Sequence, residues 1–268
     1  MIVPMPPKRS TTPARLPPSS GRLVRGLRVA EVYAICAAWQ SASSSAENMQ
    51  RVRATDVMGN TSGYSTSAFA TAISQRFDLS GRDRDLTLLA KAGIGFDIFR
   101  PILLWRTCLS ETILHRFFTD WLYARYRGGS QSVSSEEVLP FVQQLHARKL
   151  IPKRWSLSSE QRISSALLTM AAEAGLIEAG RSRRFKSFQM PDEAFIYLLH
   201  AMHERQPNAH DLVHSTDWHM FLMDAAEVER QLFRLHQFRR LHYEAAGTIA
   251  QLSLPCASAT DYVREITR

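Results

Sequence analysis

Residues 155–190 read WSLSSEQRISSALLTMAAEAGLIEAGRSRRFKSFQM, a run that predicts one amphipathic helix followed at once by a short β-hairpin. Ser158 or Ser159 can cap the start of this helix, and Gly175 predicts its end because glycine accepts the left-handed conformation. Four apolar side chains recur at helical spacing and predict a buried face: Ile163, Leu167, Met170 and Ala174. A helix followed by a hairpin is the second half of a winged helix-turn-helix, in which that helix enters a DNA groove.

The opposite face of this predicted helix is small and polar. It holds Gln161, Ser165, Thr169 and Ala172, with Arg162 at its flank. A face of this kind can approach a DNA groove or a phosphate closely, and it is equally typical of an ordinary solvated helix surface. On the first interpretation, Arg162, Ser165 and Thr169 are candidate DNA contacts.

The hairpin carries a strongly basic tip. Residues 176–178 and 185–188 have strand character, and the loop before the helix, residues 149–155, is also basic. Arginines gathered at a hairpin tip repel one another unless an anion lies nearby, and each duplex phosphate neutralised there adds ~0.9 to the salt dependence of binding. The alternative is a solubilising turn. The candidate phosphate contacts are Lys153, Arg154, Arg181, Arg183, Arg184 and Lys186.

The charge of the 268-residue chain, formally +8, is unevenly distributed. Residues 1–28 hold six basic side chains and no acidic one, and residues 128–191 hold nine basic against five acidic. Residues 192–268 are acidic instead, with seven basic side chains against eleven. This distribution favours a polyanionic partner, although solvated basic faces with a basic tail would look the same.

Composition and glycine turns divide the chain. Residues 1–24 are rich in proline and arginine and are expected to form a disordered arm. Residues 25–84 predict an N-terminal helix-turn-helix-like module, with helices over residues 29–39 and 46–55 and a third helix from Ser65 or Thr66 to Phe77. Its candidate DNA contacts are Thr66, Ser67 and Arg76.

Residues 85–268 predict a second, larger helical domain. Two long helices are expected within residues 85–126, broken near residues 93–95 and again around Pro101. A winged helix is expected over about residues 110–190, followed by helices over residues 192–202 and 225–238 and a hairpin within residues 241–255. The predicted fold class is therefore mainly α, with helix-turn-helix and winged-helix elements and short β-hairpins.

Several other functions find no support in the sequence. Cys36, Cys108 and Cys256 are widely spaced and predict neither a disulfide framework nor a cysteine zinc site. The five histidines from His200 to His219 could hold a metal, but no HExxH motif accompanies them and Pro207 interrupts the segment, so histidines on helix surfaces are the favoured interpretation. No apolar run reaches the length of a membrane span, and no signal peptide is visible. We expect a cytoplasmic protein without catalytic residues, metal, cofactor or small-molecule substrate.

Several longer runs resemble one family. They are FFTDWLYARYRGG (117–129), AGLIE (174–178), STDWHMFLMDAAEVERQL (215–232) and LHYEAAGTIAQLSLP (241–255), with GNTSGYSTSAFATAISQRF (59–77) matching more loosely. Together they are similar to BrxA, the small protein of BREX bacteriophage-exclusion systems, over roughly residues 25–268. The resemblance implies a mostly helical protein that binds double-stranded DNA without catalysis and supports phage defence beside the other BREX proteins.

The leading hypothesis is a non-enzymatic accessory protein that binds double-stranded DNA. Because phosphate contacts position a protein and carry little sequence information, the expected specificity is low. The alternative is a protein-interaction adaptor that docks other defence-system subunits through its winged folds.

Overall fold

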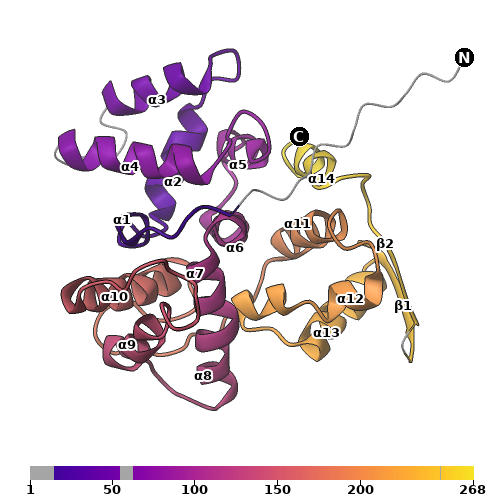
Figure 1. Cartoon of the computed structure of the whole chain (residues 1–268). Helices are drawn as coiled ribbons and strands as arrows, with labels where there is room; N and C mark the ends of the chain where they lie inside the picture. The colour runs from indigo at the N-terminus through magenta and orange to yellow at the C-terminus, as the bar shows by residue number, and fades with distance from the viewer. Residues whose placement is uncertain (1–14, 55–62, 248) are drawn as a thin grey trace, which may run out of the picture.

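The computed structural model describes residues 15–54, 63–247 and 249–268, and within them the fold is built almost entirely from helices (Figure 1). The N-terminal part forms α1 (Ser20–Leu23), α2 (Val29–Ala38), α3 (Ser45–Ala54), α4 (Gly63–Arg76) and α5 (Arg84–Lys91). Helix α2 packs against α5, and α3 packs against α4. The three helices predicted for the N-terminal module are therefore confirmed to within a few residues.

A long buried helix follows and runs through the middle of the molecule. Helix α6 (Phe96–Ser110) is almost wholly buried from Phe99 to Ser110. The break predicted around Pro101 is wrong, because α6 continues through this proline, with the loss of one backbone donor. The chain instead leaves the helical conformation at Glu111 (φ −114°, ψ 92°).

The next helical stretch consists of α7 (Thr112–Arg116), a π-helical segment η1 (Phe117–Leu122) and α8 (Tyr123–Arg127). A π turn adds a residue to the helical circuit and so changes which side chains share a face. Phe117 and Phe118 are adjacent in the sequence, yet both are fully buried, with ring centroids 5.2 Å apart. Both rings of this segment therefore belong to the core.

Helices α9 (Ser135–Gln143) and α10 (Leu157–Glu173) come next and pack closely together. A capping box begins α9, because the Ser134 hydroxyl accepts from the Glu137 N–H while the Glu137 carboxylate accepts from the Ser134 N–H. The C-terminal part comprises α11 (Asp192–His203), α12 (Ala209–Val213), the 3₁₀ segment η2 (Thr216–Phe221), α13 (Ala225–Gln237) and α14 (Ala259–Ile266).

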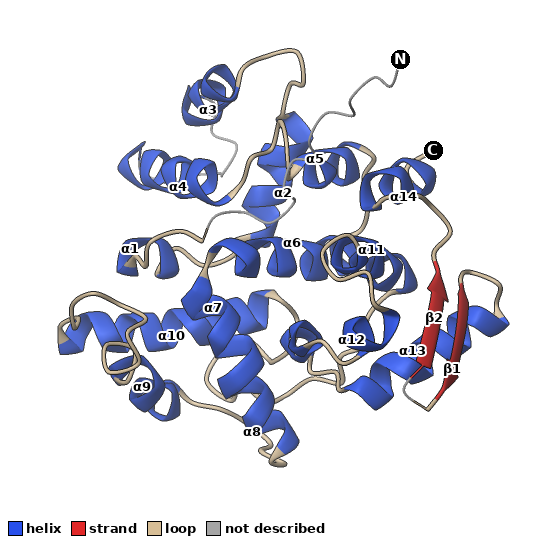
Figure 2. Ribbon diagram, turned by 45° about the vertical axis from the view of Figure 1, so that its right-hand side comes forward, coloured by secondary structure: helices blue, strands red, loops and turns tan. Residues whose placement is uncertain are grey.

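The predicted C-terminal hairpin is confirmed, and it lies at the edge of the molecule beside α13 (Figure 2). Strands β1 (His242–Ala246) and β2 (Ile249–Ser253) are antiparallel, with Tyr243 opposite Leu252 and Ala246 opposite Ile249. Of the β1 side chains, only that of Tyr243 is buried.

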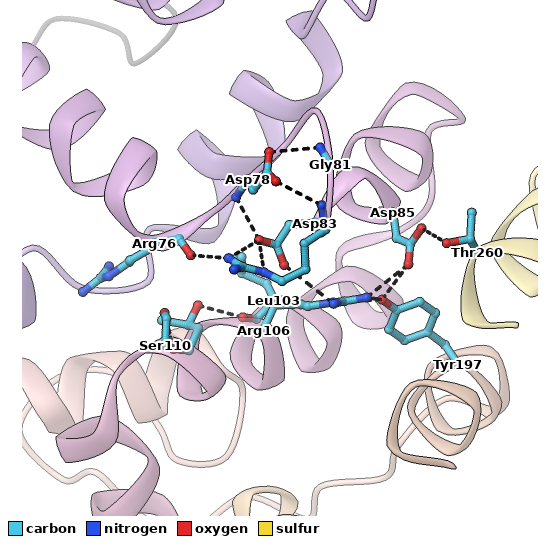
Figure 3. A network of polar contacts seen from close by, with 12 residues as sticks. Arg76, Asp78, Gly81, Asp83, Asp85, Leu103, Arg106, Ser110, Tyr197 and Thr260 are labelled. Carbon is cyan, nitrogen blue, oxygen red and sulfur yellow. Dashed lines mark hydrogen bonds and ion pairs between the residues drawn. The ribbon is translucent and has the colours of Figure 1, made fainter. Parts of the chain in front are cut away.

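A buried polar network ties the N-terminal and C-terminal parts together (Figure 3). The Arg106 guanidinium on α6 lies 3.1 Å from the Asp85 carboxylate on α5, and the Tyr197 hydroxyl on α11 donates to the same carboxylate at 3.1 Å. The Thr260 hydroxyl on α14 donates to the other oxygen of Asp85 at 2.8 Å. Because buried charges are stable only when paired, this network fixes four helices relative to one another.

The segment expected as a disordered arm differs in part from that expectation. Residues 1–14 lie outside the described part of the chain, whereas Ser20–Leu23 form α1, capped by the Ser19 hydroxyl. Leu23 is fully buried, and the Arg22 side chain is anchored on Glu111 at 2.8 Å. A buried leucine and a buried ion pair hold these residues despite the prolines just before them.

Candidate nucleic-acid interface

Helix α10 follows the pattern expected of it. The predicted buried face is confirmed, because Ile163, Leu167 and Met170 are fully buried and Ala174 is 3% exposed. The cap is Ser156 rather than Ser158 or Ser159, since its hydroxyl accepts from the Ser159 N–H and the helix begins one residue after it. Gly175 ends the helix at φ +85°, as predicted.

The opposite face of α10 is open to solvent over part of its length. Gln161, Arg162 and Thr169 are exposed, and Ser165 is half-buried. The Thr169 hydroxyl donates back to the Ser165 carbonyl at 3.0 Å, while the Ser165 hydroxyl receives the Arg183 guanidinium at 3.5 Å. The predicted polar face therefore exists, and the wing reaches it.

The predicted hairpin after α10 also exists, as short pairings rather than long strands. The Glu178 N–H donates to the Arg184 carbonyl at 2.8 Å, and the Lys186 N–H donates to the Leu176 carbonyl at 2.9 Å. A third segment, residues 131–133, pairs with the second strand of this hairpin, where the Phe185 N–H donates to the Gln131 carbonyl at 3.1 Å. The sequence analysis missed this third segment, which is too short to show an alternating pattern.

The hairpin tip, which we call the wing tip (residues 179–184), presents its cations to solvent. Arg181 and Arg184 are exposed, as is the neighbouring Lys186, and none of the three pairs with an acidic group among the described residues. Arg183 has a positive φ of 38° and is half-buried against α10, and partial burial lowers the pKa of its guanidinium. One arginine of the tip thus rests on the helix while the others point outward.

The basic loop before α10 contributes less free charge than its sequence suggests. Lys153 is exposed and has no acidic partner in the described part of the chain. The Arg154 guanidinium lies 3.3 Å from the Glu160 carboxylate, which is itself buried in the first turn of α10. Arg154 therefore compensates a buried carboxylate, and Lys153 is the freer cation.

The N-terminal candidates fare unequally. Ser67 is exposed on α4, and Thr66 lies in the same helix, but its side chain is outside the described residues. The prediction that Arg76 contacts DNA is wrong, because this residue is 1% exposed. Its guanidinium donates to the Glu111 carboxylate at 3.1 Å and to the Gly26 carbonyl at 2.8 Å. Burial lowers the pKa of its guanidinium, and Glu111 opposes this effect. An arginine so enclosed cannot reach a ligand.

The sequence analysis also missed two arginines that lie beside α10. Helix α1 packs against α10, and the Glu173 carboxylate accepts the Leu27 and Arg28 N–H groups at 2.8 and 3.2 Å. Burial raises the pKa of Glu173, which these backbone donors counteract. This contact brings Arg25 and Arg28 against the exposed face of α10. The signal was absent locally, because the partners are separated by about 145 residues.

The histidines considered as a possible metal site, and set aside in favour of surface histidines, do not converge. His200 is buried against Tyr262, with ring centroids 5.4 Å apart, whereas His219 stacks on Tyr123 at 3.8 Å. His210 and His214 stack on each other at 4.2 Å. Across the described ranges, no three His, Cys, Asp or Glu side chains are arranged to hold a metal ion. Nor do the described helices include one long and apolar enough to cross a membrane.

The fold and this surface define a class of protein, a mainly helical one that displays a capped helix and a basic hairpin on one side. The chain belongs to the BrxA family, whose model matches residues 20–201, and membership implies a component of a BREX bacteriophage-exclusion system. Its fold is similar to that of an uncharacterized protein from Magnetospirillum magneticum, with a TM-score of 0.57 and 13% identity over 76% of this chain and 98% of that one. No curated protein matches the chain.

Proposed function

We propose that this protein binds double-stranded DNA as a non-enzymatic accessory component of its phage-defence system. The observation that carries the proposal is the contact of Arg183 with the Ser165 hydroxyl, which joins the wing tip to the polar face of α10. The order of elements is helix, short strand, two helices and hairpin, as in a winged helix-turn-helix. In such modules the second of the paired helices meets the DNA groove.

The chemistry of this surface favours the DNA backbone over the bases. Arg181, Arg184, Lys186 and Lys153 are exposed without acidic partners in the described part of the chain, as phosphate-binding cations must be. Beyond its first turn, the exposed side chains of α10 that could read a base edge are Gln161, Arg162 and Thr169, fewer than these cations. We therefore expect binding with low sequence specificity and a strong dependence on salt.

The test is a fluorescence-anisotropy titration on duplex DNA over a series of salt concentrations. The triple variant Arg181→Ala, Arg183→Ala, Arg184→Ala should bind more weakly, and its salt slope should be smaller by up to ~2.7. A charge-matched control, Arg230→Ala, Arg264→Ala, Arg268→Ala, changes three exposed arginines of the C-terminal part and should bind like the wild type. Unchanged binding in the wing variant would remove the wing from the interface.

A second candidate function, a protein-interaction adaptor, is favoured by a different observation. Large apolar side chains are exposed on and beside the C-terminal hairpin, with Phe238 at 67% and Ile249 at 75% exposed. Exposed apolar groups of this size suit a protein partner. On this alternative, the wild-type protein should bind duplex DNA only weakly on its own, and it should co-purify with the other proteins of its defence system.

A further inference from the structure

A hollow of about 330 Å³ lies where α1, the start of α2, α4 and the first turns of α10 meet. Figures 1 and 2 both show α1 between α4 and α10. We call this hollow the junction groove, and its polar lining consists of Arg25, Arg28, Arg162, Ser20 and Ser159. A second depression of about 360 Å³ shares the three arginines and continues along α10 past Ser165 and Thr169.

The junction groove has an excess of positive charge. Arg162 is exposed and Arg25 half-exposed, and neither pairs with an acidic group among the described residues. Arg28 is held in place by Glu31 at 2.8 Å and lies 5.1 Å above the Phe69 ring. Three guanidinium groups around one hollow repel one another, so an anion in the hollow would relieve the repulsion.

The nearby carboxylates do not neutralise this charge fully. Glu173 lines the continuation of the groove, but its carboxylate accepts the backbone N–H groups of Leu27 and Arg28. Glu31 compensates Arg28 alone. The two remaining arginines have no acidic partner among the described residues, and together with the hydroxyls of Ser20 and Ser159 they offer hydrogen-bond donors of the kind that recognise phosphate oxygens.

We infer that the junction groove, beside α10, binds phosphates of the DNA backbone. The inference rests on the proposed function and extends it. Along α10 the groove passes Ser165, whose hydroxyl already receives Arg183 of the wing tip. Cations of the groove and of the wing tip therefore both border the exposed face of α10.

The experiment compares full-length wild-type protein with the double variant Arg25→Ala, Arg162→Ala in the same anisotropy titration. Loss of two phosphate contacts should lower the salt slope by ~1.8 and raise Kd roughly tenfold per arginine. The charge-matched control is Arg230→Ala, Arg264→Ala. Neither Arg25 nor Arg162 makes a side-chain hydrogen bond or ion pair with another described residue, so the double variant should fold. A second measurement uses the single charge reversal Arg162→Glu, and a thermal melt of each variant checks its folding.

The outcomes separate the two proposals. Tight wild-type binding with a weakened double variant supports the groove, whereas wild-type and double-variant titrations that coincide would overturn it and leave the wing assignment standing. Wild-type protein that fails to bind duplex DNA would overturn both. A further arm adds inorganic phosphate at constant ionic strength. If phosphate raises the melting temperature of the wild type alone while DNA binding is equal in both proteins, the groove takes free phosphate and the DNA inference is wrong.

Discussion

At the scale of single residues, Glu111 is the most consequential side chain of the N-terminal half. Its carboxylate is 2% exposed and faces Arg22 at 2.8 Å and Arg76 at 3.1 Å, so one anion compensates two buried cations. Removing one partner of a buried ion pair leaves an uncompensated charge and costs about 3–5 kcal/mol. A Glu111→Gln variant should therefore lose roughly this much free energy of unfolding in a urea titration.

The matched control for Glu111 is an exposed pair on the next helical turn. Arg116 and Asp120 lie 3.1 Å apart, and their side chains are 51% and 40% exposed. Such surface pairs contribute about 0–1 kcal/mol, so Asp120→Asn should shift the urea midpoint little. Equal effects of the two substitutions would contradict the central role assigned to Glu111.

His200 should make stability depend on pH. Burial, followed by the charge of His203, lowers its pKa from 6.5 to about 4. In the unfolded chain the imidazole regains its ordinary pKa, so between pH 6.5 and 4 the unfolded state binds a proton that the folded state does not. With respect to this group, the free energy of unfolding is therefore highest above pH 6.5. It falls as the pH drops towards 4, by at most roughly 3 kcal/mol.

The measurement is urea unfolding at several pH values between 7 and 4. A His200→Phe variant keeps an aromatic ring against Tyr262 and should lose stability less steeply with falling pH than the wild type. Substituting the exposed His146 by Gln is the control and should leave the wild-type slope in place. A His200→Phe curve parallel to that of the wild type would show that the imidazole does not titrate in this range.

At the scale of elements, the short helix α14 buries side chains against both α5 and α11. Its Ala259, Tyr262 and Val263 are at most 3% exposed, and it packs on α11 and α5. Burying a large apolar side chain contributes about 1.5–3 kcal/mol, so a chain shortened by residues 259–268 should lose roughly 3–6 kcal/mol. Urea unfolding measures this loss, and removal of Arg268 alone should cost little. Unchanged stability without α14 would mean that α5 and α11 hold together by themselves.

Elements also show what the sequence could and could not predict. The helices with one apolar face, α10 and α13, were predicted well because a 3.6-residue period leaves a local pattern in the sequence. The start of α10 was misplaced because three serines near it can all cap a helix. Pro101 was read as a break because a proline costs one backbone hydrogen bond, and the burial of α6 outweighs that cost.

At the scale of the whole molecule, the candidate site is assembled from distant parts of the chain. The wing-tip arginines could be recognised from sequence because they are neighbours. Arg25 could not, because its place beside α10 depends on Glu173 binding the backbone just after it. Arg76 looked like a surface cation at the end of a helix, and its burial depends on Glu111, which lies 35 residues away. Contacts of this range leave no local pattern.

Charge also divides the whole molecule. Arg25, Arg28 and Arg162 lie where α1 meets α10, and further arginines lie at the wing tip, whereas residues 192–268 are acidic in sum. An anionic polymer is therefore attracted to one part and repelled by the other, which orients the protein before contact. The exposed apolar groups of the hairpin belong to the acidic part.

The hydrogen bonds to Asp85 come from residues that are added to the growing chain long after it. Thr260, the donor to one of its carboxylate oxygens, is added 175 residues after it, and Tyr197 is added 112 residues after it. At 5–20 residues per second, roughly 10–35 s separate the emergence of Asp85 from that of Thr260. Until then, the Asp85 carboxylate can already pair with Arg106 of α6, but it lacks two of its hydroxyl donors. The polar network that joins the N-terminal helices to the rest of the fold is therefore complete only after Thr260, at the start of α14, has been synthesised.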